Sequence, residues 1–250
     1  MIKVIVIGAA GRMGGQVIQH LRANKNFKIV AAVEGPTNAR LGEDAGLVSG
    51  GSKLGLAIQD SLEAVIGSGD VVIDFSHHEA TVGHLRIAAH YGKASVVGTT
   101  GHTAEEKKEI EALAQELPLV MAPNMSIGVN VMWKILTEAA RILGPDFHVG
   151  VREVHHIHKK DKPSGTALQI VHLLSETLGL DQQEIVVESV REGEVVGDHT
   201  TRFEGPGESL EITHRATSRD PFVFGALRAA EWVANKPNGL YSMVDVLGIR

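Results

Sequence analysis

The stretch Ile2-Lys3-Val4-Ile5-Val6-Ile7-Gly8-Ala9-Ala10-Gly11-Arg12-Met13-Gly14 decides the fold class of this chain. Residues 2–7 are apolar and mostly β-branched, which is typical of a strand buried in a parallel sheet. The glycines that follow predict a tight turn into a helix that extends to about Arg22. A second apolar strand, residues 29–33, ends at Glu34, so the segment predicts a βαβ unit.

A glycine turn followed by an acid at the end of the second strand is the pattern of dinucleotide binding. The glycines let the backbone approach a pyrophosphate at the helix N-terminus, and the acid can accept from an adenosine ribose hydroxyl. The spacing here, Gly-x-x-Gly-x-x-Gly, is not the commonest form. A glycine turn alone is weak evidence, but the flanking strand, the helix and Glu34 together predict a cofactor site.

The next part of the chain alternates strands and helices. Apolar strands are predicted at residues 70–75, 95–98 and 119–122, with helices at about 79–91 and 104–117. This order predicts a doubly wound parallel sheet, whose ligands bind beyond the carboxyl ends of the strands. We expect the turns after the strands to form one crevice, with Ser76 and His77 at its wall. The predicted cofactor residues are Gly8, Ala9, Ala10, Gly11, Arg12, Met13, Glu34, Gly98, Thr99, Thr100, Ala122, Pro123, Asn124 and Met125.

The pattern changes after residue 126 and predicts a second domain. A long helix is stopped by Gly144-Pro145. Strands and one further helix follow, which predicts an open mixed sheet covered by helices on one face. We expect a final helix to return the chain to the first domain. The predicted elements are helices 127–143, 164–178 and 222–234 and strands 148–156, 184–190, 198–203 and 209–217, giving domains 1–125 with 218–250, and 126–217.

The second domain contains the stretch Glu153-Val154-His155-His156-Ile157-His158-Lys159-Lys160-Asp161-Lys162-Pro163-Ser164-Gly165-Thr166-Ala167. Ser164 can cap a helix whose first-turn N–H groups, at Gly165 and Thr166, have no partner inside the helix. Such a helix start binds anions, and the lysines add positive charge. Histidines exchange protons near neutral pH. The stretch predicts a pocket for a small anion whose chemistry needs a proton donor.

Two other interpretations of this stretch stay open. A segment rich in histidine and lysine is usually a solvated loop. The pair His156-x-His158 also resembles two metal ligands. The absence of cysteine and the neighbouring lysines, which repel a cation, argue against a metal, and we expect none.

Composition narrows the class of protein. The chain has 250 residues, a formal net charge of −6 and no cysteine, so neither a disulfide framework nor thiolate chemistry is expected. Its negative balance argues against general nucleic-acid binding. The apolar run at residues 1–8 is too short for a signal peptide or a membrane span. We expect a cytoplasmic protein with no nucleic-acid or membrane partner.

The order of residues from Glu153 to Ala167 resembles the signature of the dihydrodipicolinate reductase (4-hydroxy-tetrahydrodipicolinate reductase) family. The signature is Glu-x-His-His-x-x-Lys-x-Asp-x-Pro-Ser-Gly-Thr-Ala, and this chain fills every fixed position. The resemblance covers nearly the whole chain. It includes residues 8–14, 98–101, 124–130 and 210–214.

The resemblance implies an enzyme that moves hydride from a reduced nicotinamide cofactor to a cyclic imine dicarboxylate. The product would be tetrahydrodipicolinate, on the route to diaminopimelate and lysine. It implies His155 and Lys159 as catalytic residues, with Lys159 as the proton donor, and His156, Gly165 and Thr166 as substrate-binding residues. It also implies a cytoplasmic homotetramer with the second-domain sheets at its centre.

Two positions depart from the family pattern. Gly35 and His77 stand where well-known members have arginines near the adenosine phosphate. Since a 2′-phosphate would face Glu34 without those cations, we expect use of both NADH and NADPH with NADH preferred. Three rival functions are another Rossmann dehydrogenase, a nucleotide-sensing protein without catalysis and a histidine-ligated metalloenzyme.

Overall fold

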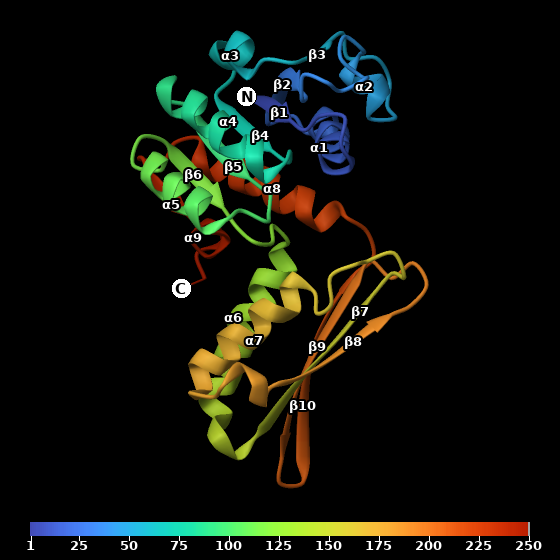
Figure 1. The fold of residues 1–250 in the computed structure, drawn as a ribbon, viewed down its shortest axis with the longest axis vertical. Coiled ribbons are helices and arrows are strands. Elements are labelled where there is room, and N and C mark those ends of the chain that lie inside the picture. Colours follow the sequence, from blue (N-terminus) through green and yellow to red (C-terminus); the bar gives the residue numbers. More distant parts are fainter. Residues whose placement is uncertain (250) are drawn as a thin grey trace. The chain divides into compact units, whose positions relative to one another are not determined.

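The chain forms two compact units, seen in a computed structural model that describes residues 1–249 (Figure 1). Unit 1 consists of Met1–Met125 and Phe222–Gly248, and unit 2 consists of Ser126–Pro221. The chain returns to unit 1 near the start of its last long helix, at Phe222. This is four residues later than residue 218, where the sequence predicted the return. None of the described helices combines the length and the apolar character that a membrane span needs.

Unit 1 is a seven-stranded parallel sheet flanked by helices, in the order β11-β6-β5-β4-β1-β2-β3. This confirms the predicted doubly wound sheet. Its strands are β1 (Ile2–Ile7), β2 (Phe27–Val33), β3 (Ile58–Gln59), β4 (Val71–Asp74), β5 (Ala94–Val97), β6 (Pro118–Met121) and β11 (Gly239–Tyr241). Its helices are α1 (Arg12–Ala23), α2 (Ala45–Val48), α3 (Leu62–Val65), α4 (His78–His90), α5 (Ala104–Leu113), α8 (Asp220–Val233) and α9 (Met243–Leu247).

The central strands form because their side chains are apolar on both faces. Val4, Val6 and Ile73 have no exposed surface, as expected for strands covered by helices on both sides. β1 pairs with β2 on one side and with β4 on the other. The strand order therefore reverses at β1, and the carboxyl ends of these strands form the switch point where such sheets bind ligands.

Four short elements of unit 1 differ from the sequence prediction. They are α2, α3, β11 and α9, none longer than five residues. Segments of this length show no periodicity that separates helix from strand. β11 forms because Gly239–Tyr241 pairs with β6 at the sheet edge, a long-range contact that the local sequence does not contain.

Unit 2 is a four-stranded mixed sheet in the order β10-β9-β7-β8, which confirms the predicted open mixed sheet. β7 runs parallel to β8, and β9 is antiparallel to both β7 and β10. Figure 1 shows α6 and α7 side by side along the sheet. The elements are β7 (His148–His155), β8 (Val186–Arg191), β9 (Gly197–Gly205), β10 (Glu208–Ala216), α6 (Ile127–Leu143) and α7 (Gly165–Leu178).

The core of unit 2 lies between the two helices and one face of the sheet. Leu136 of α6, Leu174 of α7 and Phe203 of β9 are at most 1% exposed and belong to one cluster. Ser126 caps α6 by accepting from the Val129 N–H. Gly144, with a φ of +69°, ends α6 as the Gly-Pro pair predicts.

Candidate active site

Two glycines of the turn between β1 and α1 are sterically required. Gly8 has a φ of +75°, and a Cβ atom there would lie 2.4 Å from the Phe75 carbonyl oxygen. A Cβ atom on Gly14 would lie 2.0 Å from the Gly8 carbonyl oxygen. Because both distances are far below van der Waals contact, only glycine fits at these positions. Unit 1 therefore needs the predicted glycine turn for its own packing.

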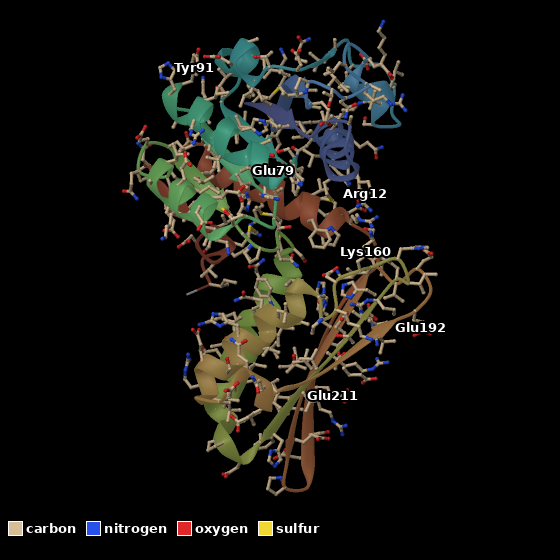
Figure 2. The ribbon with its side chains drawn as sticks, viewed as in Figure 1. Arg12, Glu79, Tyr91, Lys160, Glu192 and Glu211 are labelled. Atoms are coloured by element: carbon tan, nitrogen blue, oxygen red, sulfur yellow. The ribbon has the colours of Figure 1, made fainter. Side chains whose placement is uncertain are left out.

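The N-terminus of α1 has no side-chain cap. Its capping residue is Gly11, and the first turn contains no acidic residue. The first-turn N–H groups and the helix dipole therefore face the end of the helix without a competing side-chain acceptor, which favours an anion. Arg12, labelled in Figure 2, is exposed and begins this helix.

Glu34 connects the end of β2 to the glycine turn. Its Oε2 atom accepts a hydrogen bond from the Ala10 N–H at 2.9 Å, and its Oε1 atom accepts from the Gly35 N–H at 3.0 Å. A carboxylate oxygen has more than one acceptor position. Glu34 can therefore hold the turn and still accept from a ribose hydroxyl.

A pocket of about 530 Å³ lies at the carboxyl ends of β1, β2 and β4, at the switch point. Gly8, Gly11 and Glu34 line it together with Ser76 and His77. The structure therefore brings these predicted residues together at one cavity. Among the described residues, the other predicted cofactor residues do not line it: Ala9, Ala10, Arg12, Met13, Gly98, Thr99, Thr100, Ala122, Pro123, Asn124 and Met125.

The predicted residues after β5 and β6 follow the sheet along the same edge, and two have packing roles. A Cβ atom on Gly98 would lie 2.0 Å from the Phe75 ring. A Cβ atom on Gly225 of α8 would lie 1.7 Å from the Met125 carbonyl oxygen, so α8 packs directly on that backbone. Both glycines allow two elements of unit 1 to approach closely.

A buried carboxylate that belongs to no sequence motif organises this edge. Asp74 is 2% exposed and accepts from the Ser76 hydroxyl at 2.6 Å and the Thr99 hydroxyl at 3.2 Å. His84, which lines the pocket, lies 2.8 Å from it through Nδ1. Burial alone would raise the pKa of Asp74, but His84 and Ser76 outweigh it and the pKa is lowered. Asp74 thus links β4, β5 and α4.

In unit 2, the signature stretch folds around an ion pair. Glu153 of β7 has no exposed surface, and His155 is 7% exposed. His155 Nδ1 contacts Glu153 Oε2 at hydrogen-bond distance. Arg191 of β8 donates from Nη1 to both Glu153 oxygens, at 2.9 and 3.0 Å. The register brings them together because His155 pairs with Arg191 across the parallel strands.

Lys159 lies in the loop that follows. Its Nζ atom forms an ion pair with Asp161 Oδ2 at 2.8 Å, and its side chain is 23% exposed. Burial alone would raise the pKa of Asp161, but Lys159 outweighs it and the pKa is lowered. Arg191 Nη2 also donates to the Asp161 carbonyl oxygen at 2.5 Å. Figure 2 labels the neighbouring Lys160 at this end of the sheet.

The predicted helix start is present. Ser164 caps α7 by accepting from the Ala167 N–H at 3.2 Å. Gly165 and Thr166 are the first two residues of the helix. A Cβ atom on Gly165 would meet no atom within 4 Å, so there is open space beside this residue. An N-terminus with open space beside it suits a small anion.

Two more histidines surround this site. His199 of β9 lies 3.1 Å from the Ser164 hydroxyl through Nε2, and its ring meets that of His155 edge to face at 5.1 Å. Burial and the nearby His155 lower the pKa of His199 to about 3. His156 lies in the adjacent loop, with its ring 6.0 Å from that of His158.

Within residues 1–249, no three His, Asp or Glu side chains converge as a metal site requires.

Comparisons with known proteins place this geometry in a family. Residues 2–125 match the family model described as dihydrodipicolinate reductase, N-terminus, and residues 128–247 match its C-terminus. A 4-hydroxy-tetrahydrodipicolinate reductase of Anaeromyxobacter dehalogenans strain 2CP-1 is 44% identical over 100% of this chain and 99% of its own. The reductase of Citrifermentans bemidjiense is also 44% identical, over 100% of both chains.

Solved structures show the same fold. Dipicolinate-bound dihydrodipicolinate reductase from Paenisporosarcina sp. TG-14 has a TM-score of 0.83 at 24% identity, over 100% of both chains. Amine dehydrogenase from Mycobacterium smegmatis has a TM-score of 0.64 at 15% identity, over 97% of this chain and 95% of its own. With both family models and full-length relatives matched, this chain belongs to the dihydrodipicolinate reductase family.

Proposed function

We propose that this protein is a 4-hydroxy-tetrahydrodipicolinate reductase, which reduces a cyclic imine dicarboxylate to tetrahydrodipicolinate in lysine and diaminopimelate biosynthesis. The observation that carries the proposal is the ordered constellation of unit 2. A buried Glu153–His155 pair and Lys159 lie in the same stretch as an open helix N-terminus. The names of the full-length relatives support the same activity.

Unit 1 is the proposed cofactor domain. The cradle fits a dinucleotide because α1 presents an uncapped N-terminus, and Gly8, Gly11 and Glu34 line the pocket beside it. The α1 N–H groups would hold the pyrophosphate, and Glu34 would accept from the adenosine ribose. When bound, the reduced nicotinamide supplies hydride. The remaining cofactor contacts come from the predicted residues after β5 and β6.

Unit 2 is the proposed substrate domain. The N–H groups of Gly165 and Thr166, with the Thr166 hydroxyl, would bind one substrate carboxylate, and His156 would bind beside them. Lys159 would donate the proton that quenches the electron density left by hydride transfer, since a positioned cationic acid is suited to that step. Asp161, 2.8 Å from Nζ, holds the ammonium group in place.

The predicted cofactor preference depends on charge near Glu34. Gly35 adds no cation beside this carboxylate, and His77 is 67% exposed, with Nδ1 3.5 Å from Glu79. Arg40 pairs with Glu43 at 3.1 Å. A 2′-phosphate would therefore meet a carboxylate with little compensating charge. We propose that both cofactors are used and that NADH is preferred.

We further propose a cytoplasmic homotetramer that assembles through the unit 2 sheets. The support is the apolar surface that these strands expose. Val186 of β8 is 72% exposed and Leu210 of β10 is 41% exposed. Light scattering of the purified protein would measure the oligomer directly.

The function is tested by following NADH and NADPH oxidation with freshly generated 4-hydroxy-tetrahydrodipicolinate and with a panel of other small keto and imino acids. The proposal expects rapid oxidation with the cyclic imine alone. It also expects competitive inhibition by pyridine-2,6-dicarboxylate, a flat ring with two carboxylates. Oxidation with another panel member and none with the cyclic imine would identify a different Rossmann dehydrogenase.

A further inference from the structure

Glu153 is a fully buried ionisable group with partners on both sides. Burying a carboxylate costs several kcal/mol unless hydrogen bonds replace its water shell. Here burial alone would raise the pKa of Glu153, but hydrogen bonds from surrounding side chains, those of His155 and Arg191 included, outweigh it and the pKa is lowered. Glu153 is therefore an anion at neutral pH, although no step of the reduction uses it.

An ionised carboxylate fixes the proton arrangement of His155. A carboxylate can only accept hydrogen bonds, so the ring nitrogen that contacts Glu153, Nδ1, must carry the hydrogen. Burial is the largest influence on His155 and lowers its pKa although Glu153 opposes this, so the ring is neutral at pH 7. A neutral imidazole carries one N–H. Its second nitrogen, Nε2, is therefore an acceptor.

Gly197 of β9 lies beside Nε2. A Cβ atom on Gly197 of β9 would lie 3.0 Å from His155 Nε2, so the glycine leaves room beside that nitrogen. The charged or titratable groups around the ring are Glu153 on β7, Arg191 on β8, His199 on β9 and Lys159 in the following loop. Of these, only Glu153 contacts Nδ1.

Arg191 joins the two candidate catalytic residues through one side chain. Its Nη1 atom donates to both oxygens of Glu153, which holds His155. Its Nη2 atom donates to the carbonyl oxygen of Asp161, whose carboxylate pairs with Lys159. The planar guanidinium has donors in a fixed fork, so it sets the distance between these two partners. A lysine could not form the hydrogen bonds to Glu153 and to Asp161 at the same time in this geometry.

We propose that Glu153 and Arg191 are positioning residues. Glu153 holds His155 in the Nδ1–H tautomer so that Nε2 accepts, and Arg191 ties that pair to the loop that carries Lys159. The inference rests on the proposed reductase function and sharpens it, because His155 in this state cannot supply the proton. Its role is to accept a hydrogen bond through Nε2, and Lys159 remains the donor.

The test combines a spectrum with kinetics. Long-range ¹H–¹⁵N spectra of the wild-type protein, assigned with His155→Asn, should show Nε2 of His155 unprotonated at pH 7. In Glu153→Gln the amide can donate as well as accept, and we expect part of the population to shift to the Nε2–H tautomer. We expect kcat to fall about 100-fold, which is what a small misplacement of a positioning group can cost. The NADH Kd should not change, because the change lies in unit 2.

Glu188→Gln is the matched control. Glu188 lies on β8 and pairs with Arg152 at 3.2 Å with 63% of its side chain exposed, so the same substitution there should leave kcat and the His155 spectrum unchanged. Arg191→Lys should keep the Nδ1–H tautomer of His155, since Glu153 remains. It should lower kcat, because the hydrogen bond from Nη2 to the Asp161 carbonyl oxygen is lost. Glu153→Asp keeps an acceptor-only group and should restore the Nδ1–H tautomer.

The spectrum and the kinetics together separate this proposal from the proposed reductase function. A wild-type spectrum with Nε2–H would overturn the proposal even if no variant folded. An unchanged tautomer and kcat in Glu153→Gln would do the same. An active reductase with Nε2–H refutes only this inference. A protein with no reductase activity but with the expected tautomer shift would refute the proposed function and leave the role of Glu153 in place.

Discussion

The turn before α1 forms an anion site in unit 1, and the loop after β7 forms one in unit 2. The two sites differ in the groups that form them. The turn uses main-chain N–H groups, and at Gly8 and Gly14 a single added carbon would lie within 2.4 Å of a carbonyl oxygen. The loop adds charged side chains beside the N-terminus of α7, and a buried ion pair between Glu153 and Arg191 supports it. The first site is therefore sensitive to volume and the second to charge.

This difference leads to separate failures. A substitution that adds volume in the turn should weaken cofactor binding and leave the proton chemistry intact. A substitution that removes charge in the loop should slow the chemical step and leave cofactor binding intact. The predictions below test that separation, beginning with the largest expected effect.

Lys159→Ala should lower kcat by about 100- to 10,000-fold, because it removes the positioned proton donor. The NADH Kd should remain within a factor of two, since Lys159 belongs to unit 2. Steady-state kinetics and a fluorescence titration with NADH measure the two quantities. Lys108→Ala, on α5 of unit 1, is the control for loss of an exposed lysine. Normal turnover in Lys159→Ala would make it a surface lysine.

His199 should make unit 2 sensitive to acid. Its pKa is about 3 in the folded protein, below the ordinary value of about 6.5. Well above pH 6.5 the ring is neutral in both the folded and the unfolded chain, so it does not change the free energy of unfolding. Below pH 6.5, the His199 ring is protonated in the unfolded chain but stays neutral in the folded one. The free energy of unfolding therefore falls by about 3 kcal/mol between pH 7 and pH 4.

His199→Gln should remove this part of the pH dependence, since glutamine does not titrate and its amide oxygen can accept from Ser164. Urea unfolding of both proteins at pH 7, 5 and 4 gives the comparison. His90→Gln, at the exposed end of α4, serves as the control. Parallel pH curves for wild type and His199→Gln would contradict the assignment of a buried neutral ring.

Gly14→Ala tests the volume side of the comparison. Its Cβ atom would lie 2.0 Å from the Gly8 carbonyl oxygen, and overpacking of this kind costs about 1–3 kcal/mol. We expect a lower Tm and a raised NADH Kd, with kcat at saturating NADH nearly unchanged. Gly15→Ala is a matched control one residue away, because its Cβ atom would make an ordinary 3.7 Å contact with Ser49. Equal effects of both substitutions would remove the steric argument.

Gly35→Arg should have the smallest effect, a shift toward NADPH of about 1–2 kcal/mol in relative kcat/KM, from charge pairing with the 2′-phosphate. The wild-type ratio should favour NADH, because no arginine stands beside Glu34 in the sequence. Gly67→Arg, in the same unit, is a control for added charge, because a Cβ atom there would meet no atom within 4 Å. A wild-type enzyme that favours NADPH tenfold at neutral pH would point to Arg12 or Arg40 as phosphate ligands.

The sequence predicted the turn-based site more completely than the side-chain network. Residues 2–34 predict β1, α1 and β2 because strand, turn and helix signals are all local. Arg191, by contrast, lies 38 residues from Glu153. The parallel register of β7 and β8 brings the two together, and local periodicity does not specify register.

The same limit applies to the buried acids. Glu153 was visible as part of a motif, and Asp74 lay near the end of the predicted strand 70–75, but no local pattern predicted a partner for either. Their hydrogen bonds come from Arg191 and from Thr99, on neighbouring strands or the turns after them. Sequence patterns locate elements and motifs, whereas the residues that hold those motifs in place become visible only in three dimensions.

Deuterium transfer tests the central claim most directly. NADH carrying deuterium at the transferable position of its nicotinamide ring is mixed with freshly generated 4-hydroxy-tetrahydrodipicolinate and the enzyme, and the product is analysed by mass spectrometry. A reductase that moves hydride from cofactor to imine should give tetrahydrodipicolinate with one deuterium per NADH consumed. Unlabelled product, or no consumption of NADH or NADPH by the folded protein, would contradict it.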